Sequence, residues 1–224
     1  MPGKLVFLFD VDNTLLDNDR VAADLRNFLE EHVGHERQER YWEIFKRLRD
    51  RVGYADYLGA LQEYRAAYPR SMKVLGISNF LINYPFSERL FPNTLEVIAR
   101  ANKHGQAVIL SDGDVVFQPL KIRRSGLYEA FDGQALIYVH KEKELDDVAE
   151  RYPADHYVFV DDKLRLLAAI KEIWGPKVTT IFPRQGHYAH DAAEVAKYPA
   201  ADLTIENIGE LLEHFGELTA KFGQ

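Results

Sequence analysis

The chain has 224 residues and a mass of 25.8 kDa, and 46% of its residues are hydrophobic, which suits one compact domain or a domain with a sizeable insertion. Its 28 Lys and Arg residues against 35 Asp and Glu residues give a formal net charge of −7. Sequence-independent nucleic-acid binding and binding to anionic membranes both need basic surfaces, so neither is expected. The absence of cysteine excludes disulfides, thiolate catalysis and Cys-based metal sites, and it fits a reducing cytosol.

The first apolar run, Leu5–Phe9, ends at Asp10 and is too short for a signal-peptide core or a membrane span. No later segment approaches the roughly 20 apolar residues that a membrane helix needs. We therefore expect a soluble, cytoplasmic protein without a membrane partner.

Five short runs rich in β-branched and aromatic residues predict strands. None alternates cleanly with polar residues, which is typical of parallel strands buried on both faces. The runs are Leu5–Phe9, Ala107–Leu110, Ala135–Val139, Tyr157–Val160 and Val178–Phe182.

Helical patterns separate the later runs. Lys141–Tyr152 and Lys163–Trp174 carry apolar residues at i, i+3 and i+4, and Pro153 and Gly175-Pro176 end them. Alternation of strands and helices favours right-handed βαβ units. We therefore expect an α/β protein with a doubly wound, Rossmann-like parallel sheet.

A long helical segment interrupts this alternation after the first strand. Helical patterns cover Val21–Val33, Arg37–Val52 and Tyr54–Tyr68, with a looser piece after Pro69. Nearly eighty residues is far more than a crossover between strands requires. We expect a mostly helical insertion over residues 15–91 and an α/β core made of residues 1–14 and 92–224.

Polar residues follow four of the predicted strands. In chain order they are Asp10 and Asp12, Ser111 and Asp112, Lys141, and Asp161 and Asp162. Because ligands of open α/β sheets bind at the carboxyl ends of the strands, these side chains are expected to meet at one edge.

Carboxylates that meet there repel one another by roughly 4 kcal/mol at 4 Å and an effective dielectric of about 20, unless a cation lies among them. An all-oxygen set suits Mg²⁺, and Lys141 adds a second positive charge for a phosphoryl group. Asp10 and Asp12 are two residues apart, so both can face the same side of the chain. One can attack phosphorus while the other transfers a proton, which predicts phosphoryl transfer from a small phosphorylated substrate.

The segment Asp10-Val11-Asp12-Asn13-Thr14 resembles the DxDxT signature of the haloacid dehalogenase (HAD) superfamily. Ser111, Lys141 and Asp161-Asp162 resemble its second, third and fourth motifs, in the right order and with spacings of 30 and 20 residues. Asn13 stands where the family often has Gly. The resemblance covers the whole core from the first strand to Asp162.

The resemblance implies a phosphohydrolase that acts through an aspartyl-phosphate, with Mg²⁺ as cofactor, and a C1-type helical cap that closes over the site and selects substrates. It implies the following roles: Asp10 as nucleophile and metal ligand, Asp12 as general acid/base with its backbone carbonyl on the metal, Thr14, Ser111 and the Asp112 amide at the phosphate, Lys141 beside nucleophile and phosphate, and Asp161 and Asp162 on the metal. The carboxylate of Asp12 argues against the dehalogenase branch, which lacks an acid/base at that position.

Several alternatives stay open at this stage. A phosphomutase uses the same residues, and a catalytically silent HAD-like protein would bind phosphate or regulate. Lys143 rivals Lys141, because Glu142 stands where the third motif usually has proline. His187 and His190 have a spacing that metal sites use, but a surface or packing role is favoured.

Four arginines of the insertion, Arg20, Arg47, Arg49 and Arg51, either meet a substrate anion or form salt bridges on helix faces. The sequence does not identify the substrate or the oligomeric state.

Overall fold

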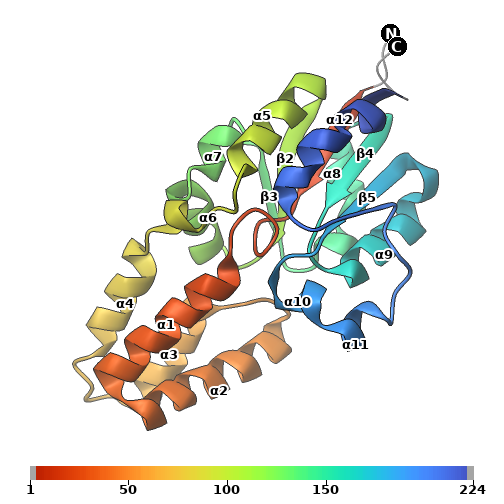
Figure 1. The fold of residues 1–224 in the computed structure, drawn as a ribbon. Helices are drawn as coiled ribbons and strands as arrows, with labels where there is room; N and C mark the ends of the chain where they lie inside the picture. The colour runs from red at the N-terminus through yellow and green to blue at the C-terminus, as the bar shows by residue number, and fades with distance from the viewer. Residues whose placement is uncertain (1–3, 221–224) are drawn as a thin grey trace.

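The computed structural model describes residues 4–220 and contains a parallel sheet with helices on both faces and a group of helices beside it (Figure 1). All neighbouring strands are parallel, in the order β3-β2-β1-β4-β5-β6. The strands are β1 (Leu5–Phe9), β2 (Gln106–Asp112), β3 (Ala135–Tyr138), β4 (His156–Val160), β5 (Val178–Pro183) and β6 (Leu203–Ile205). The doubly wound α/β fold and its five predicted strands are confirmed. The sixth strand, β6, was missed because its three residues are too few to show a pattern.

The order of the strands reverses next to β1. From β1 the chain builds β2 and β3 on one side and then β4, β5 and β6 on the other, so β1 and β4 flank the point of reversal. Phe9 is in register with Val160, and the amide of Asp10 donates to the carbonyl of Val160 (2.9 Å). The residues that follow β1 and β4 therefore leave the sheet side by side.

Alternate residues of β1 pack on opposite faces of the sheet. Phe7 and Phe9 belong to the core that also contains residues of α5 (Thr94–His104) and α12 (Leu211–Ala220). Val6 and Leu8 belong to the core under α8 (Leu145–Arg151) and α9 (Leu164–Trp174). All four side chains are fully buried, which explains why the strand reads as an uninterrupted apolar run.

Further short helices complete the layers around the sheet. They are α6 (Phe117–Arg124), α7 (Leu127–Ala130), α10 (Gly186–His190) and α11 (Ala192–Val195), with 3₁₀ helices at Phe86–Arg89, Lys141–Lys143, Gly175–Lys177 and Ile208–Glu210. None of the helices within residues 4–220 combines the length and hydrophobicity needed to cross a bilayer.

Of the five α-helices between β1 and β2, the first four lie beside the sheet (Figure 1). They are α1 (Asn18–Val33), α2 (His35–Val52), α3 (Tyr57–Ala67) and α4 (Val74–Asn83). The chain enters and leaves this group along paired segments, since Leu15 accepts from the amide of Phe91 (3.0 Å) and Arg89 accepts from the amide of Asp17 (2.8 Å). We use the name helical insertion for the helices α1–α4.

Helix starts differ from the sequence expectation where a side chain caps the backbone. Asp17 accepts from the amide of Arg20, so α1 begins at Asn18, and Asp56 accepts from the amide of Gly59, so α3 begins three residues later than predicted. The predicted helix over Lys141–Tyr152 was partly wrong. Its first residues form a 3₁₀ turn, and α8 begins only at Leu145.

The helical insertion packs directly against the sheet domain. The ring of Tyr57 lies 5.4 Å from that of Phe117, which also contacts Phe86 (5.8 Å). At the other end, Gly53 has φ = +89°, and a Cβ atom there would come within 2.5 Å of the ring of His140. The turn between α2 and α3 thus reaches the segment that carries Lys141.

Phe7→Ala should lower the free energy of unfolding by about 3–5 kcal/mol, because its ring is buried against Phe9 and Phe215 and the cavity left behind does not close fully. Urea unfolding measures this. The matched control Leu75→Ala, at a side chain that is 70% exposed, should stay within about 0.5 kcal/mol. A loss below 1 kcal/mol for Phe7→Ala would contradict this packing.

Candidate active site

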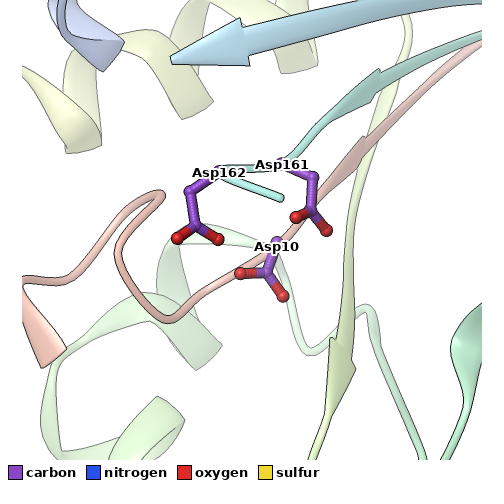
Figure 2. A group of neighbouring side chains, drawn as sticks. All are labelled: Asp10, Asp161 and Asp162. Atoms are coloured by element: carbon purple, nitrogen blue, oxygen red, sulfur yellow. The ribbon is translucent and has the colours of Figure 1, made fainter. Parts of the chain in front are cut away.

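Three buried carboxylates meet where β1 and β4 end. Asp10 follows β1, and Asp161 and Asp162 follow β4, and each offers an oxygen within 4.8 Å of the others. Figure 2 shows the three side chains pointing toward a common space. The parallel register of β1 and β4 produces this meeting, as the sequence predicted.

The two aspartates after β4 have different surroundings. Asp161 accepts from the amide of Lys163 (2.8 Å) and its other oxygen lies 2.6 Å from the ammonium of Lys141. Neither carboxylate oxygen of Asp162 has a hydrogen-bond partner within residues 4–220, although both are buried. Burial raises the pKa of both carboxyl groups, Asp162 most clearly. A buried carboxylate with two unpartnered oxygens is costly unless a cation binds it.

Lys141 lies at the centre of the acidic cluster. Its fully buried ammonium contacts the carboxylates of Asp10 (2.6 Å) and Asp161 (2.6 Å) and donates to the carbonyl of Leu110 (3.1 Å). Burial works to lower its pKa, but the charges of Asp10 and Asp161 outweigh burial and raise it. Lys143, the alternative from the sequence, is exposed. The geometry therefore favours Lys141 over Lys143.

The predicted phosphate-side residues line the same edge of the sheet. The hydroxyl of Thr14 accepts from the amide of Asp162 (3.0 Å) and lies 3.5 Å from Asp10. Ser111 at the end of β2 is buried and accepts from the side chain of Gln118 (2.9 Å). Asp112 accepts from the amide of Lys141 (2.8 Å), which ties the end of β2 to the lysine segment.

Asp12 lies apart from the three clustered acids. Its carboxylate forms a bidentate ion pair with Lys121 (2.6 and 2.8 Å), whose side chain is 1% exposed. Lys121 also donates to the side-chain oxygen of Asn18 at the start of α1 (3.0 Å). The side-chain NH₂ of Asn18 in turn donates to the hydroxyl of Tyr57 (3.4 Å). The carboxylate is thus held by a chain of contacts that runs into the helical insertion.

Sequence reasoning missed Lys121 and Lys163. Gln118 and Lys121 are three residues apart on α6, so both project from one helix face, where they contact Ser111 and Asp12. The local sequence carries no signal of these contacts. Lys163 directly follows the aspartate pair, and the charges of Asp162 and Asp10 raise its pKa although burial opposes the shift.

Hydrogen bonds among Asn13, Asp19 and His187, which we call the polar clasp, close the loop after β1. Asn13 takes φ = 62°, a left-handed conformation that Asn tolerates better than most residues, and its side chain exchanges hydrogen bonds with Asp19. Asp19 also pairs with His187 through the ring (2.7 Å) and the backbone amide (2.7 Å). His190 is exposed, and His187 and His190 are not part of the metal-capable group found within residues 4–220.

The chemistry of the donor set fits a hard cation. Every side-chain ligand atom is a carboxylate oxygen, and the unpartnered oxygens of Asp162 face those of Asp10. Three carboxylates against the ammoniums of Lys141 and Lys163 leave a formal charge of −1. A divalent cation reverses this sign and favours an anionic ligand.

A haloacid dehalogenase-like hydrolase family model matches residues 5–173, which includes all of the clustered site residues. A protein from Burkholderia xenovorans LB400, described as a haloacid dehalogenase-like hydrolase, has 56% identity over 96% of this chain and 98% of its own, with a TM-score of 0.91. The comparison with curated proteins finds no match.

Two more distant structures share the fold. The HAD-hydrolase YfnB from Bacillus subtilis, bound to magnesium, has 16% identity over 94% of this chain and 97% of its own, with a TM-score of 0.61. An L-2-haloacid dehalogenase from Xanthobacter autotrophicus, with chloropropionic acid covalently bound, has 16% identity over 93% and 97%, also with a TM-score of 0.61. The chain is therefore a hydrolase of HAD-like fold. It belongs to the haloacid dehalogenase-like hydrolase family.

Asp19→Asn tests the clasp through the pH dependence of stability. Burial works to raise the pKa of Asp19, but the hydrogen bond and charge of His187 outweigh it, so the pKa is lowered. A lowered folded-state pKa stabilises above the ordinary value near 4, and this contribution is lost as the pH falls through the folded-state pKa. We expect urea unfolding at pH 6 to show a loss of about 1 kcal/mol or less, since the group is partly exposed.

The same comparison at pH 3 should show a smaller difference between Asp19→Asn and the wild type. The exposed Asp146→Asn serves as the control, with no such trend expected. An Asp19→Asn difference that is equal at the two pH values would contradict the role of the Asp19 charge.

Proposed function

We propose that the protein is a Mg²⁺-dependent phosphohydrolase that forms an aspartyl-phosphate on Asp10 and acts on a small phosphorylated metabolite. The single observation that carries this proposal is the cluster of Asp10, Asp161 and Asp162 around Lys141, beside a second carboxylate, Asp12, outside the cluster. The helical insertion would serve as the C1-type cap. No nucleic-acid or membrane partner is proposed.

The fit to Mg²⁺ rests on the oxygen-only donors and on the unpartnered oxygens of Asp162. Asp10 and Asp162 would hold the ion through their carboxylates, Asp161 would complete the shell, and the backbone carbonyl of Asp12 is the fourth expected ligand. When bound, the ion neutralises charge on the phosphoryl group and lets a dianion approach the carboxylate of Asp10.

In the first step a carboxylate oxygen of Asp10 attacks phosphorus. The bond from phosphorus to the leaving oxygen breaks as the acyl-phosphate bond forms, and Asp12 delivers the proton that the leaving alkoxide needs. Lys141 contacts the attacking carboxylate and stabilises the negative charge that develops at the phosphoryl oxygens. Ser111 and the amide of Asp112 lie at the end of β2, where they would orient the phosphate.

In the second step water attacks the phosphorus of the aspartyl-phosphate. Asp12 accepts the proton that water loses, the acyl-phosphate bond breaks, and phosphate leaves with the carboxylate of Asp10 restored. Lys121 and Asn18 would orient the Asp12 carboxylate for both transfers.

Dehalogenation is the main competing reaction, since one structural neighbour is an L-2-haloacid dehalogenase. Halide departs without a proton, so a dehalogenase needs no acid at the position of Asp12, whereas an alkoxide leaving group does. The carboxylate of Asp12 therefore favours phosphoester hydrolysis. A phosphomutase would differ by requiring a bisphosphate activator.

Mg²⁺ should raise the melting temperature of the wild-type protein, because a ligand that binds only the folded state stabilises it. Asp162→Asn should lose most of this increase, since it removes the carboxylate whose oxygens have no other partner. Scanning fluorimetry with and without EDTA measures the shift. Asp146→Asn is the exposed control and should keep the wild-type response. An undiminished response in Asp162→Asn would rule out this ligand set.

Asp10→Asn should abolish Mg²⁺-dependent hydrolysis of phosphate monoesters, with a loss of at least about 10³-fold, while the protein stays folded. Asp12→Asn should still form some aspartyl-phosphate but hydrolyse it slowly, so that an acid quench traps phosphate on the protein. Intact-mass spectrometry measures the trapped phosphate and circular dichroism confirms folding. Full activity in Asp10→Asn would remove the mechanism, and unchanged hydrolysis of the intermediate in Asp12→Asn would remove the role of Asp12.

A further inference from the structure

A cavity of about 370 Å³ lies between the helical insertion and the edge of the sheet that carries the site. Asp12 and Lys163 line it from the core, and residues of α1, α2 and the 53–57 segment line it from the insertion. Its volume falls within the range of small-molecule sites. Because Asp12 faces the leaving group in the proposed reaction, this cavity would hold the non-phosphoryl part of the substrate.

Both acids that line the cavity already have a partner on the core side. Asp12 forms an ion pair with Lys121, and Asp19 contacts the ring of His187. Neither carboxylate forms an ion pair with the cations on the opposite wall.

The cations that α2 contributes to the cavity are not balanced in this way. The side chain of Lys46 is exposed and has no ion-pair or hydrogen-bond partner within residues 4–220. Among the described residues, Arg49 forms an ion pair only with its chain neighbour Asp50, at 4.0 Å. Burial and the charge of Asp12 raise the pKa of Tyr57, and the charge of Arg49 acts against them, so the charges of both walls reach this ring. A protein of net charge −7 thus presents surplus positive charge at this wall.

The other arginines considered from the sequence do not line the cavity. Arg20 pairs with Asp24 along α1, and Arg47 and Arg51 both pair with Glu63 on α3. The two pairs with Glu63 join α2 to α3. Of the four arginines, Arg49 alone lines the cavity.

Aromatic side chains form part of the cavity wall. Trp42, Tyr54 and Tyr57 line the cavity. The indole nitrogen of Trp42 is itself buried, so this residue contributes ring surface and no hydrogen-bond donor to the cavity. The aromatic wall therefore suits the apolar part of a ligand.

We propose that the substrate is a phosphate monoester whose other end carries a second anionic group, a carboxylate or a phosphate, bound by Lys46 and Arg49. This inference rests on the proposed phosphohydrolase function and names its substrate class. Charge-assisted hydrogen bonds of this kind are stronger than neutral ones. The two cations would therefore favour a phosphate monoester with a second anionic group over one of the same size without it.

The experiment compares matched esters that differ in the second group. The carboxylate arm compares 3-phosphoglycerate with glycerol 3-phosphate, and the phosphate arm compares fructose 1,6-bisphosphate with fructose 6-phosphate. In the wild type, kcat/KM for the ester with a second anionic group should exceed kcat/KM for the ester without it by about 10- to 100-fold in at least one pair. The double variant Lys46→Gln/Arg49→Gln should bring this ratio close to 1. The control Arg40→Gln, on an outer part of α2 away from the cavity, should keep the wild-type ratio.

A ratio near 1 in both arms of the wild type, or a ratio that the double variant leaves unchanged, would overturn the proposed substrate class while leaving the phosphohydrolase intact.

Calorimetric titration of Asp10→Asn with the same esters separates the two proposals. If no ester is hydrolysed by the wild type, the phosphohydrolase proposal fails. Tighter binding of the charged ester, lost when Lys46→Gln/Arg49→Gln is added, would still support the anion site, and equal binding of both esters would overturn it.

Discussion

The mutual repulsion of three buried carboxylates is the constraint on which the rest of the site depends. Asp10, Asp161 and Asp162 place oxygens within 4.8 Å of one another, a separation at which two like charges cost roughly 4 kcal/mol at an effective dielectric of about 20. Lys141 contacts two of the three, and Asp162 keeps two unpartnered oxygens. The donor set is therefore one that a cation would stabilise.

The sheet topology is what brings these groups together. The strand order reverses between β1 and β4, and the register of Phe9 with Val160 sets the residues after the two strands side by side. The helical insertion begins just after β1, and residues of its helix α2 line the cavity together with residues at this edge of the sheet. The proposed phosphohydrolase would hold the phosphoryl group at the sheet end of this space and the rest of its substrate beside α2.

Much of the core was predictable because its signals are local. Each of the five predicted strands is an apolar run, and Asp10 and Asp161 come directly after two of them, so parallel pairing alone brings the two residues to one edge. The strand β6 and the 3₁₀ turn at Lys141 were not predictable, because three residues carry no periodicity and the turn depends on its contact with Asp112.

The contacts around Asp12 and in the cavity depend on tertiary packing. Lys121 is 109 residues from Asp12, and a lysine on a short helix has the same local pattern whether it is solvated or buried. Lys46 and Arg49 belong to a strongly charged helix, and only the packing of that helix on α1 and α3 shows which of its cations line the cavity.

A crystal structure of the protein grown with Mg²⁺ tests the central claim most directly. The account predicts one ion at the ends of β1 and β4, with carboxylate oxygens of Asp10 and Asp162 at about 2.1 Å and Lys141 still beside Asp10. An ion bound elsewhere, or a site in which Asp162 turns away to another partner while Mg²⁺ is present in solution, would contradict it.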